Sequence, residues 1–214
     1  VQAAGEVIKD QIDCGIDIVT DGEVRRENYI HYHCRHIEGV DFNTLTEKVA
    51  RTGNYKCWLP TIVSKVKAQD SFLVHDWEVS QKLSSKPVKI TLPGPMTIAD
   101  TIANTYYTSQ DKMGFDLAEV INIEIKRLQK AGCKYIQVDE PLFARKPQQA
   151  IDFGINNLAK YATKLGLGEL TGIELKGEKA GLVPSKQWKK IFKNEPWYPG
   201  ETISASIGQG YNLV

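Results

Sequence analysis

The stretch KYIQVDEPLFARKP, residues 134–147, decides the fold class, because a β-forming run ends there in two adjacent acids. The segment from Tyr135 to Val138 favours an extended strand. Asp139 and Glu140 follow at once, before a proline that stiffens the turn. An acidic pair directly after an apolar strand costs stability unless a ligand, a metal or a cationic side chain uses it. The stretch therefore indicates a strand that ends at a binding face.

Two further stretches follow the same plan of a strand and a tight turn. IDIVTD at 16–21 is rich in β-branched residues and runs into the acidic turn Asp21-Gly22-Glu23. VKITLPGPMTIAD at 88–100 leaves its strand at Gly94, which stands between two prolines. A glycine there lets a ligand or another part of the chain approach the backbone closely, although an ordinary loop between a strand and a helix explains it equally well.

The spacing of apolar residues predicts helices between these strands. One more β-rich segment spans 54–68, and helical patterns cover 1–14, 25–39, 72–83, 116–132 and a region from about 147 onward. Strands that alternate with helices are typical of parallel βα units. The sequence therefore predicts an α/β fold with a parallel sheet.

Acids stand at the carboxyl ends of two predicted strands, Asp21 and Glu23 at one and Asp139 and Glu140 at the other. Because such ends form the binding face of a parallel sheet, we expect these side chains to line one pocket. A carboxylate there can hold a substrate ammonium, and one of the nearby arginines, Arg25 or Arg26, can hold a substrate carboxylate. The competing interpretation is that the acids cap the helices that follow. The residue types leave both interpretations open.

The segment HYHCRH at 31–36 raises the question of a metal site. Residues two apart on a helix point to different sides, so only His33 and His36 share a face. No second pair of Cys or His follows downstream to complete a zinc site. We therefore expect a polar helix that lines the pocket rather than a metal centre.

Length and composition place the chain among ordinary globular proteins. It has 214 residues, 25% charged residues and a net charge of +1, which gives no case for binding nucleic acid or an acidic membrane surface. No apolar run approaches the roughly 20 residues of a membrane span. The four scattered cysteines form no CxxC pair, which favours a reduced, cytoplasmic setting. Because the chain enters a helix directly from Val1, we expect it to be a fragment whose start is missing.

Taken together, IDIVTDGEVRRENYI, ITLPGPMTI and AGCKYIQVDEPLFARKP resemble the cobalamin-independent methionine synthase family in their order and spacing. The resemblance covers residues 1–158. It implies a (β/α)8 TIM-type barrel, of which these residues supply only a part, since a full barrel takes about 250 residues. It also implies a methyltransferase of methionine biosynthesis, which moves a methyl group from a methylfolate or methyl-corrinoid donor to homocysteine.

The resemblance assigns roles to particular residues. Glu23 of the DGE motif and Asp139 of the DEP motif match the acids that hold the homocysteine amino group. Gly94 matches a loop near the methyl donor. Asp21, Arg26 and Glu140 are the other residues that we expect to line the pocket.

The resemblance also implies a zinc ion that activates the thiol. In the family its ligands, a His-x-Cys pair, a Glu and a later Cys, all follow the DEP motif. Here no His and no Cys follows Asp139. We therefore expect no bound metal and no catalysis by these residues, because the thiol of homocysteine stays mostly protonated near neutral pH.

The C-terminal part is similar to another family. LAKYATKLGLGELTGIELKGEKAGLVPS and WYPGETISASIGQGY resemble the transpeptidase domain of penicillin-binding protein 2, which cross-links peptidoglycan. The resemblance covers residues 159–214. The Ser-x-x-Lys, Ser-x-Asn and Lys-Thr-Gly motifs of that chemistry are absent from these residues. The two resemblances predict a chimera of two domain fragments, 1–158 and 159–214.

Three functional hypotheses follow. The first is a partial methionine synthase-type barrel whose Glu23 and Asp139 bind homocysteine without catalysis. The second is an inert fragment of a penicillin-binding transpeptidase. The third is a non-enzymatic module whose exposed acids bind a small cationic molecule.

Overall fold

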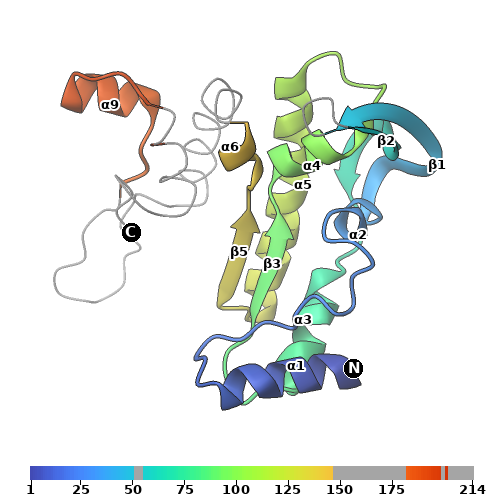
Figure 1. The fold of residues 1–214 in the computed structure, drawn as a ribbon, viewed down its shortest axis with the longest axis vertical. Coiled ribbons are helices and arrows are strands. Elements are labelled where there is room, and N and C mark those ends of the chain that lie inside the picture. Colours follow the sequence, from blue (N-terminus) through green and yellow to red (C-terminus); the bar gives the residue numbers. More distant parts are fainter. Residues whose placement is uncertain (51–54, 147–181, 199–200, 202–214) are drawn as a thin grey trace. The chain divides into compact units, whose positions relative to one another are not determined.

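The computed structural model describes residues 1–50, 55–146, 182–198 and 201 (Figure 1). The chain divides into two compact units, Val1–Asp139 and Glu140–Val214. The predicted domain boundary near residue 158 lies outside the described residues, and so does the helix predicted from about residue 147. Among the described residues no helix is both long enough and apolar enough to cross a bilayer.

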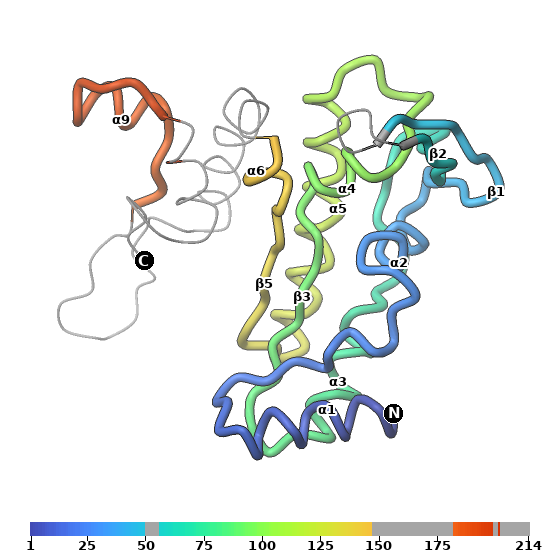
Figure 2. The backbone as a smooth tube through the Cα atoms, viewed as in Figure 1, coloured from blue at the N-terminus to red at the C-terminus, as the bar shows by residue number. Residues whose placement is uncertain are grey.

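The first unit is a mixed α/β structure, and its path is followed most easily in Figure 2. In chain order its elements are α1 (Gln2–Asp13), α2 (His31–Cys34), β1 (Ile37–Ala50), β2 (Tyr55–Ala68), α3 (Leu73–Lys82), β3 (Lys89–Pro93), α4 (Pro95–Thr101), β4 (Ala103–Asn104), α5 (Gln110–Ala131) and β5 (Tyr135–Asp139).

The predicted parallel arrangement is confirmed for β3 and β5, which pair in parallel from Lys89 opposite Tyr135 to Pro93 opposite Asp139. Val19 forms a parallel bridge with Val88, just before β3, so the predicted strand at 16–21 is reduced to one bridge. Three chain segments thus run in the same direction side by side, with acids after the first and at the end of the third. Closure into a barrel is not seen among the described residues.

The helix predicted at 25–39 is wrong, because most of that segment is loop and strand. Asn28 Oδ1 accepts the backbone N–H groups of Ile30 and His31 at 2.9 Å, so the helix begins late and spans only His31–Cys34. Gly39, the last residue of that predicted helix, lies within β1 at φ +96°. A Cβ atom there would meet the carbonyl oxygens of Ser64 and Lys65 at 2.8 Å, so only glycine lets the two strands approach.

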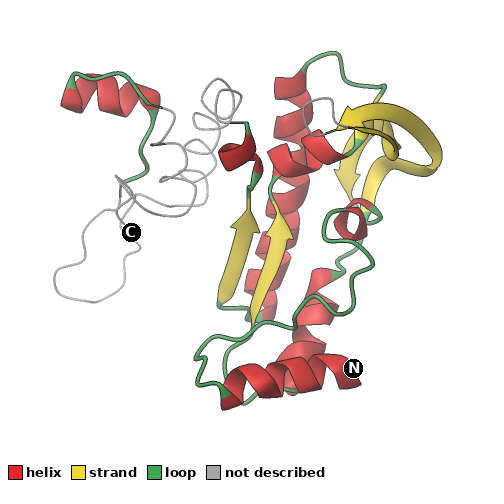
Figure 3. Ribbon diagram, viewed as in Figure 1, coloured by secondary structure: helices red, strands yellow, loops and turns green. Residues whose placement is uncertain are grey.

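The long strands β1 and β2 form an antiparallel hairpin, which the predicted parallel pattern does not contain (Figure 3). The register shifts between Glu38 and Val40 and again between Asp41 and Leu45. β4 adds a short parallel pairing to β2. Lys48 Nζ fastens the hairpin to the end of α4 by donating to the carbonyl oxygens of Asp100 at 2.6 Å and Ile102 at 3.0 Å.

The helix predicted at 116–132 is confirmed, although α5 begins earlier, where the Ser109 hydroxyl accepts the Lys112 N–H. Its buried apolar stripe, Leu117, Val120, Ile121 and Leu128, forms one core cluster with Ile90 and Leu92 of β3. In Figure 1, α5 runs behind β3 and β5. One face of this strand pair is therefore covered by the helix, and the alternate residues, Thr91, Gln137 and Asp139 among them, point to the other face.

The second unit contains α6 (Leu142–Arg145) and α9 (Lys186–Lys193) among its described residues. Ser185 caps α9 by accepting the Trp188 N–H at 3.1 Å. Lys189 is buried and forms ion pairs with Glu195 and Glu201, which draw the following segment back onto the helix.

Candidate active site

The acidic turn after the first strand has an unusual backbone. Gly22 and Glu23 both adopt left-handed conformations, at φ +65° and +57°. Such a conformation is uncommon for a non-glycine residue and is found where the surroundings hold it in place. Asp21 supplies that support, because its Oδ1 atom accepts the Glu23 N–H at 3.0 Å. Asp21 is only 2% exposed, so it supports the turn from beneath.

The Glu23 carboxylate is held over the β3 strand by two donors. Its Oε1 atom accepts the Thr91 hydroxyl at 2.6 Å and lies 3.1 Å from Arg26 Nη1. Arg26 also donates to Thr91 Oγ1 at 3.2 Å and to the Thr91 carbonyl at 2.9 Å. Its side chain is 1% exposed, whereas that of Glu23 is 32% exposed. A buried cation therefore orients a partly exposed carboxylate.

Asp139, at the end of β5, is held by a second polar chain. Its Oδ1 atom accepts Gln137 Nε2 at 2.7 Å, and Gln137 Oε1 accepts Lys89 Nζ at 2.7 Å. The Asp139 carbonyl accepts the Gly94 N–H at 2.7 Å, which ties the β3 turn to the end of β5. Gly94, which we expected to line the pocket, is thus bonded through its backbone to Asp139.

The structure brings Glu23, Arg26, Gly94 and Asp139 to the same pair of strands, with Asp21 beneath. The role of Glu140 stays a prediction: it begins the second unit, and its carbonyl accepts the Phe143 N–H at 3.1 Å. Sequence reasoning did not single out Thr91 and Gln137, which contact Glu23 and Asp139. The signal that could have found them is a polar residue in the middle of each apolar strand, at KITLP and YIQVD.

The neighbouring Arg25 points to a different partner. Its Nε atom lies 3.3 Å from Asp76 Oδ1, and the Tyr32 hydroxyl donates to Asp76 Oδ2 at 2.7 Å. Burial and the hydrogen bond to Asp76 raise the pKa of Tyr32. Arg25 therefore joins α3 to the segment before α2, and it does not reach Glu23.

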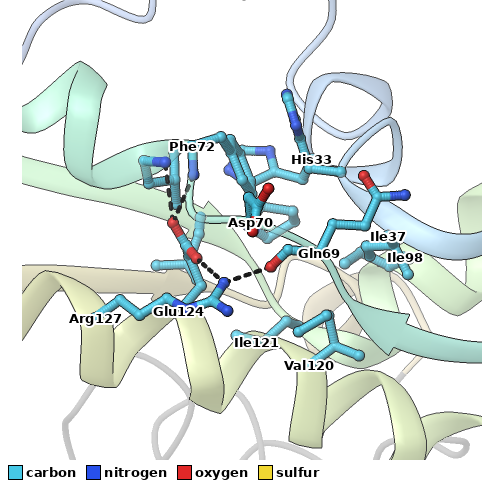
Figure 4. Close-up of a pocket in the computed structure, with 15 residues that line it drawn as sticks. His33, Ile37, Gln69, Asp70, Phe72, Ile98, Val120, Ile121, Glu124 and Arg127 are labelled. Carbon is cyan, nitrogen blue, oxygen red and sulfur yellow. Dashed lines mark hydrogen bonds and ion pairs between the residues drawn. The ribbon is translucent and has the colours of Figure 1, made fainter.

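His33 and His36 line a small cavity between α2, α3 and α5 (Figure 4). Its volume of about 30 Å³ has room for one or two water molecules, too little for an amino acid. Burial lowers the pKa of His33 to about 3, so the imidazole is neutral at physiological pH. His33 Nδ1 donates to the Tyr29 carbonyl at 2.9 Å. His36 stacks on Phe72 with ring centroids 4.1 Å apart.

Glu124, which also lines this cavity, stabilises the start of α3. Its Oε1 atom accepts the Ser71 hydroxyl and the backbone N–H groups of Phe72 and Leu73, at 2.6 to 3.1 Å. Its Oε2 atom pairs with Arg127 at 3.2 Å. A side chain of α5 thus caps the start of α3, which has no side-chain cap of its own. Across the described residues no three His, Cys, Asp or Glu side chains gather in a way that could hold a metal ion.

The geometry can be compared with known proteins. The model of the cobalamin-independent synthase catalytic domain family matches residues 1–153. The chain belongs to this family. A curated methionine synthase from Saccharolobus solfataricus is 39% identical over 142 residues, which are 65% of this chain and 42% of that protein. One from Sulfolobus acidocaldarius is 33% identical over 153 residues, 71% of this chain and 44% of that protein. The chain thus spans about two fifths of the length of these relatives.

Solved structures support the same fold. A B12-independent methionine synthase from Shewanella sp. W3-18-1, in complex with selenomethionine, has a TM-score of 0.71 and 32% identity, over 94% of this chain and 58% of that one. A putative vitamin-B12 independent methionine synthase from Listeria monocytogenes has a TM-score of 0.52 and 16% identity, over 100% of this chain and 52% of that one. The described residues are thus part of a mixed α/β fold similar to these enzymes.

A penicillin-binding protein 2 from Pseudomonas aeruginosa covers 32% of this chain at 36% identity, with a TM-score of 0.28. That superposition carries no argument about the fold. The assignment of residues 159–214 to a transpeptidase fragment, and the chimera, stay predictions.

Proposed function

We propose that residues 1–153 are the part of a methionine synthase-type catalytic domain that binds the amino group of homocysteine, through the carboxylates of Glu23 and Asp139. The substrate ammonium carries three N–H donors and one positive charge, and it is matched by two carboxylates on one side of a strand pair.

One observation carries the proposal. Glu23 and Asp139 each use one oxygen within the protein, Oε1 and Oδ1 respectively. The other oxygen of each carboxylate has no hydrogen-bond partner among the described residues. The carboxylate of an acid that only capped a helix would accept backbone N–H groups, as Glu124 Oε1 does. Two half-used carboxylates are instead suited to a cationic ligand.

The relatives support the choice of ligand. The Shewanella enzyme was solved with selenomethionine, an amino acid with an ammonium group of the same kind. In this proposal Arg26 does not hold the substrate carboxylate, because its side chain is only 1% exposed and its Nη1 and Nη2 atoms contact Glu23 and Thr91. It instead keeps Glu23 in place.

The methyl transfer is proposed for the complete enzymes and not for these residues alone. In the family zinc supplies the activation of the thiol, and its ligands there follow the DEP motif. The described residues offer no fitting donor set. We therefore propose that this chain binds homocysteine without transferring a methyl group.

Calorimetric titration of the whole chain with homocysteine and with 4-mercaptobutanoate, which lacks only the amino group, tests the proposal. The wild-type chain should prefer homocysteine. Glu23→Gln and Asp139→Asn should each weaken homocysteine binding by about 10-fold or more, the value of one hydrogen bond to a charged group. Glu119→Gln, an exposed acid on α5, is the matched control. Equal affinity of the wild-type chain for both ligands would refute the proposal.

A further inference from the structure

We infer that Thr91 and Gln137 are positioning residues, which hold the two carboxylates so that one oxygen of each faces the ligand. This inference rests on the proposed function, because it concerns the same site. Neither residue is one of the acids that carry the family resemblance. Both occupy the middle of a strand, and they face each other across the β3–β5 pair.

The Thr91 hydroxyl can donate its hydrogen to only one of its two side-chain neighbours, Arg26 and Glu23. Arg26 Nη1 can only donate, so the Thr91 oxygen accepts from it at 3.2 Å. A carboxylate can only accept, so the Thr91 hydroxyl donates to Glu23 Oε1 at 2.6 Å. The hydrogen bonds therefore run from Arg26 to Thr91 and from Thr91 to Glu23, because the guanidinium can only donate and the carboxylate can only accept. This arrangement fixes the orientation of a side chain on a left-handed turn 68 residues away in sequence.

The Gln137 amide is oriented by the same kind of argument. Lys89 Nζ can only donate, so the amide oxygen must face it. The amide NH₂ group is then turned toward Asp139 Oδ1. The reversed amide would place two donors together at Lys89 and two acceptors together at Asp139. Gln137 therefore links a cation at the start of β3 to an acid at the end of β5.

The strand register brings these two series of hydrogen bonds next to each other. Thr91 and Gln137 are direct partners in the parallel ladder, on strands about 4.8 Å apart. Asp139 lies opposite Pro93, two residues beyond this pair. Thr91 therefore contacts Glu23, and Gln137 contacts Asp139, from facing positions of the two strands.

Two substitutions test the inference by removing the hydrogen bonds while keeping the shape. Thr91→Val and Gln137→Met should each lower the affinity for homocysteine about 5-fold, less than the loss of a carboxylate that contacts the ammonium directly, and leave the affinity for 4-mercaptobutanoate unchanged. Thr91→Ser should restore homocysteine binding because it keeps the hydroxyl. Thr46→Val, which removes a hydroxyl bonded to Thr61 in the hairpin, should change neither affinity. In the Glu23→Gln background, Thr91→Val should cost less than in the wild-type chain.

The outcomes separate this inference from the proposed function. If the wild-type chain does not distinguish the two ligands, both fail together. If it does and Thr91→Val binds homocysteine as the wild-type chain does, only this inference fails. An equal loss for both ligands would indicate a merely structural role and overturn it. The ligand-free crystal structure of Thr91→Val is an independent check, because a Glu23 carboxylate that stays in place there would also overturn it.

Discussion

Two strand pairs of the first unit differ in what they do. β1 and β2 are antiparallel strands of 14 residues each, and they leave large apolar side chains in solvent, with Val49 55% and Trp58 64% exposed. β3 and β5 are parallel strands of five residues each, with the apolar side chains of β3 buried in the α5 core. The candidate site lies on the short pair.

The difference follows from how each pair is connected. An antiparallel hairpin pairs its own backbone groups, and here Ile37, Ile62 and Val66 anchor it in the same core as α5. A parallel pair needs a crossover helix, here α5, so its carboxyl ends are brought to one edge by the core itself. The polar residues Thr91 and Gln137 are thereby placed on facing strands of the short pair.

The largest expected change in unfolding free energy comes from a substitution in α5, the helix that covers the parallel pair. Glu124→Ala should lower the free energy of unfolding by about 3 kcal/mol or more, because it leaves Arg127 and the start of α3 without their buried partner. Urea unfolding followed by circular dichroism measures it. Glu119→Ala on the exposed side of α5 should change it by less than about 0.5 kcal/mol. Similar losses in both variants would contradict the capping role of Glu124.

Two glycine substitutions sharpen the comparison between the pairs. Gly39→Ala in the hairpin and Gly22→Ala in the acidic turn each place a Cβ at positive φ, less than 3 Å from another atom. Each should cost about 2 kcal/mol of unfolding free energy. Only Gly22→Ala should also weaken homocysteine binding, since it disturbs Glu23. Gly15→Ala, at φ +84° with open space around it, separates backbone strain from the clash. Loss of binding in Gly39→Ala would show that the hairpin shapes the site.

The smallest effect is a pH dependence from His33 in α2, just before the hairpin. His33 has a pKa of about 3 in the folded chain, against an ordinary 6.5, because burial and the nearby Arg26 disfavour its charged form. The unfolded chain therefore binds a proton first as pH falls below 6.5, and stability declines by up to about 1.4 kcal/mol per pH unit. The lowered pKa values of His31 and His36 act in the same direction.

Thermal unfolding of the wild-type chain and of His33→Gln between pH 7 and pH 5 checks this prediction. The variant should lose less stability than the wild-type chain over that range. His75→Gln on the exposed side of α3 is the control and should keep the wild-type slope. Parallel curves for the wild-type chain and His33→Gln would show that His33 does not set the dependence.

Much of the fold could be predicted where local pattern and tertiary structure agree. The stripe of α5, the strands ending in Pro93 and Asp139, and the parallel pairing follow from period and from alternation. The segment 25–39 could not, because its apolar and histidine spacing fits a helix, while the Asn28 cap and the close strand contact at Gly39 favour the hairpin. The local pattern of a segment does not specify which distant strand that segment will pair with.

The sequence by itself determined the family, the α/β class and the presence of acids at the ends of two strands. Only the tertiary structure decided which arginine serves Glu23, since Arg25 and Arg26 are adjacent and chemically alike but contact Asp76 and Thr91. It also placed Thr91 and Gln137 opposite each other, because strand register brings them together from 46 positions apart (137 minus 91). The physical reason is that residue type sets what a side chain can bind, whereas only packing and register set what lies within reach.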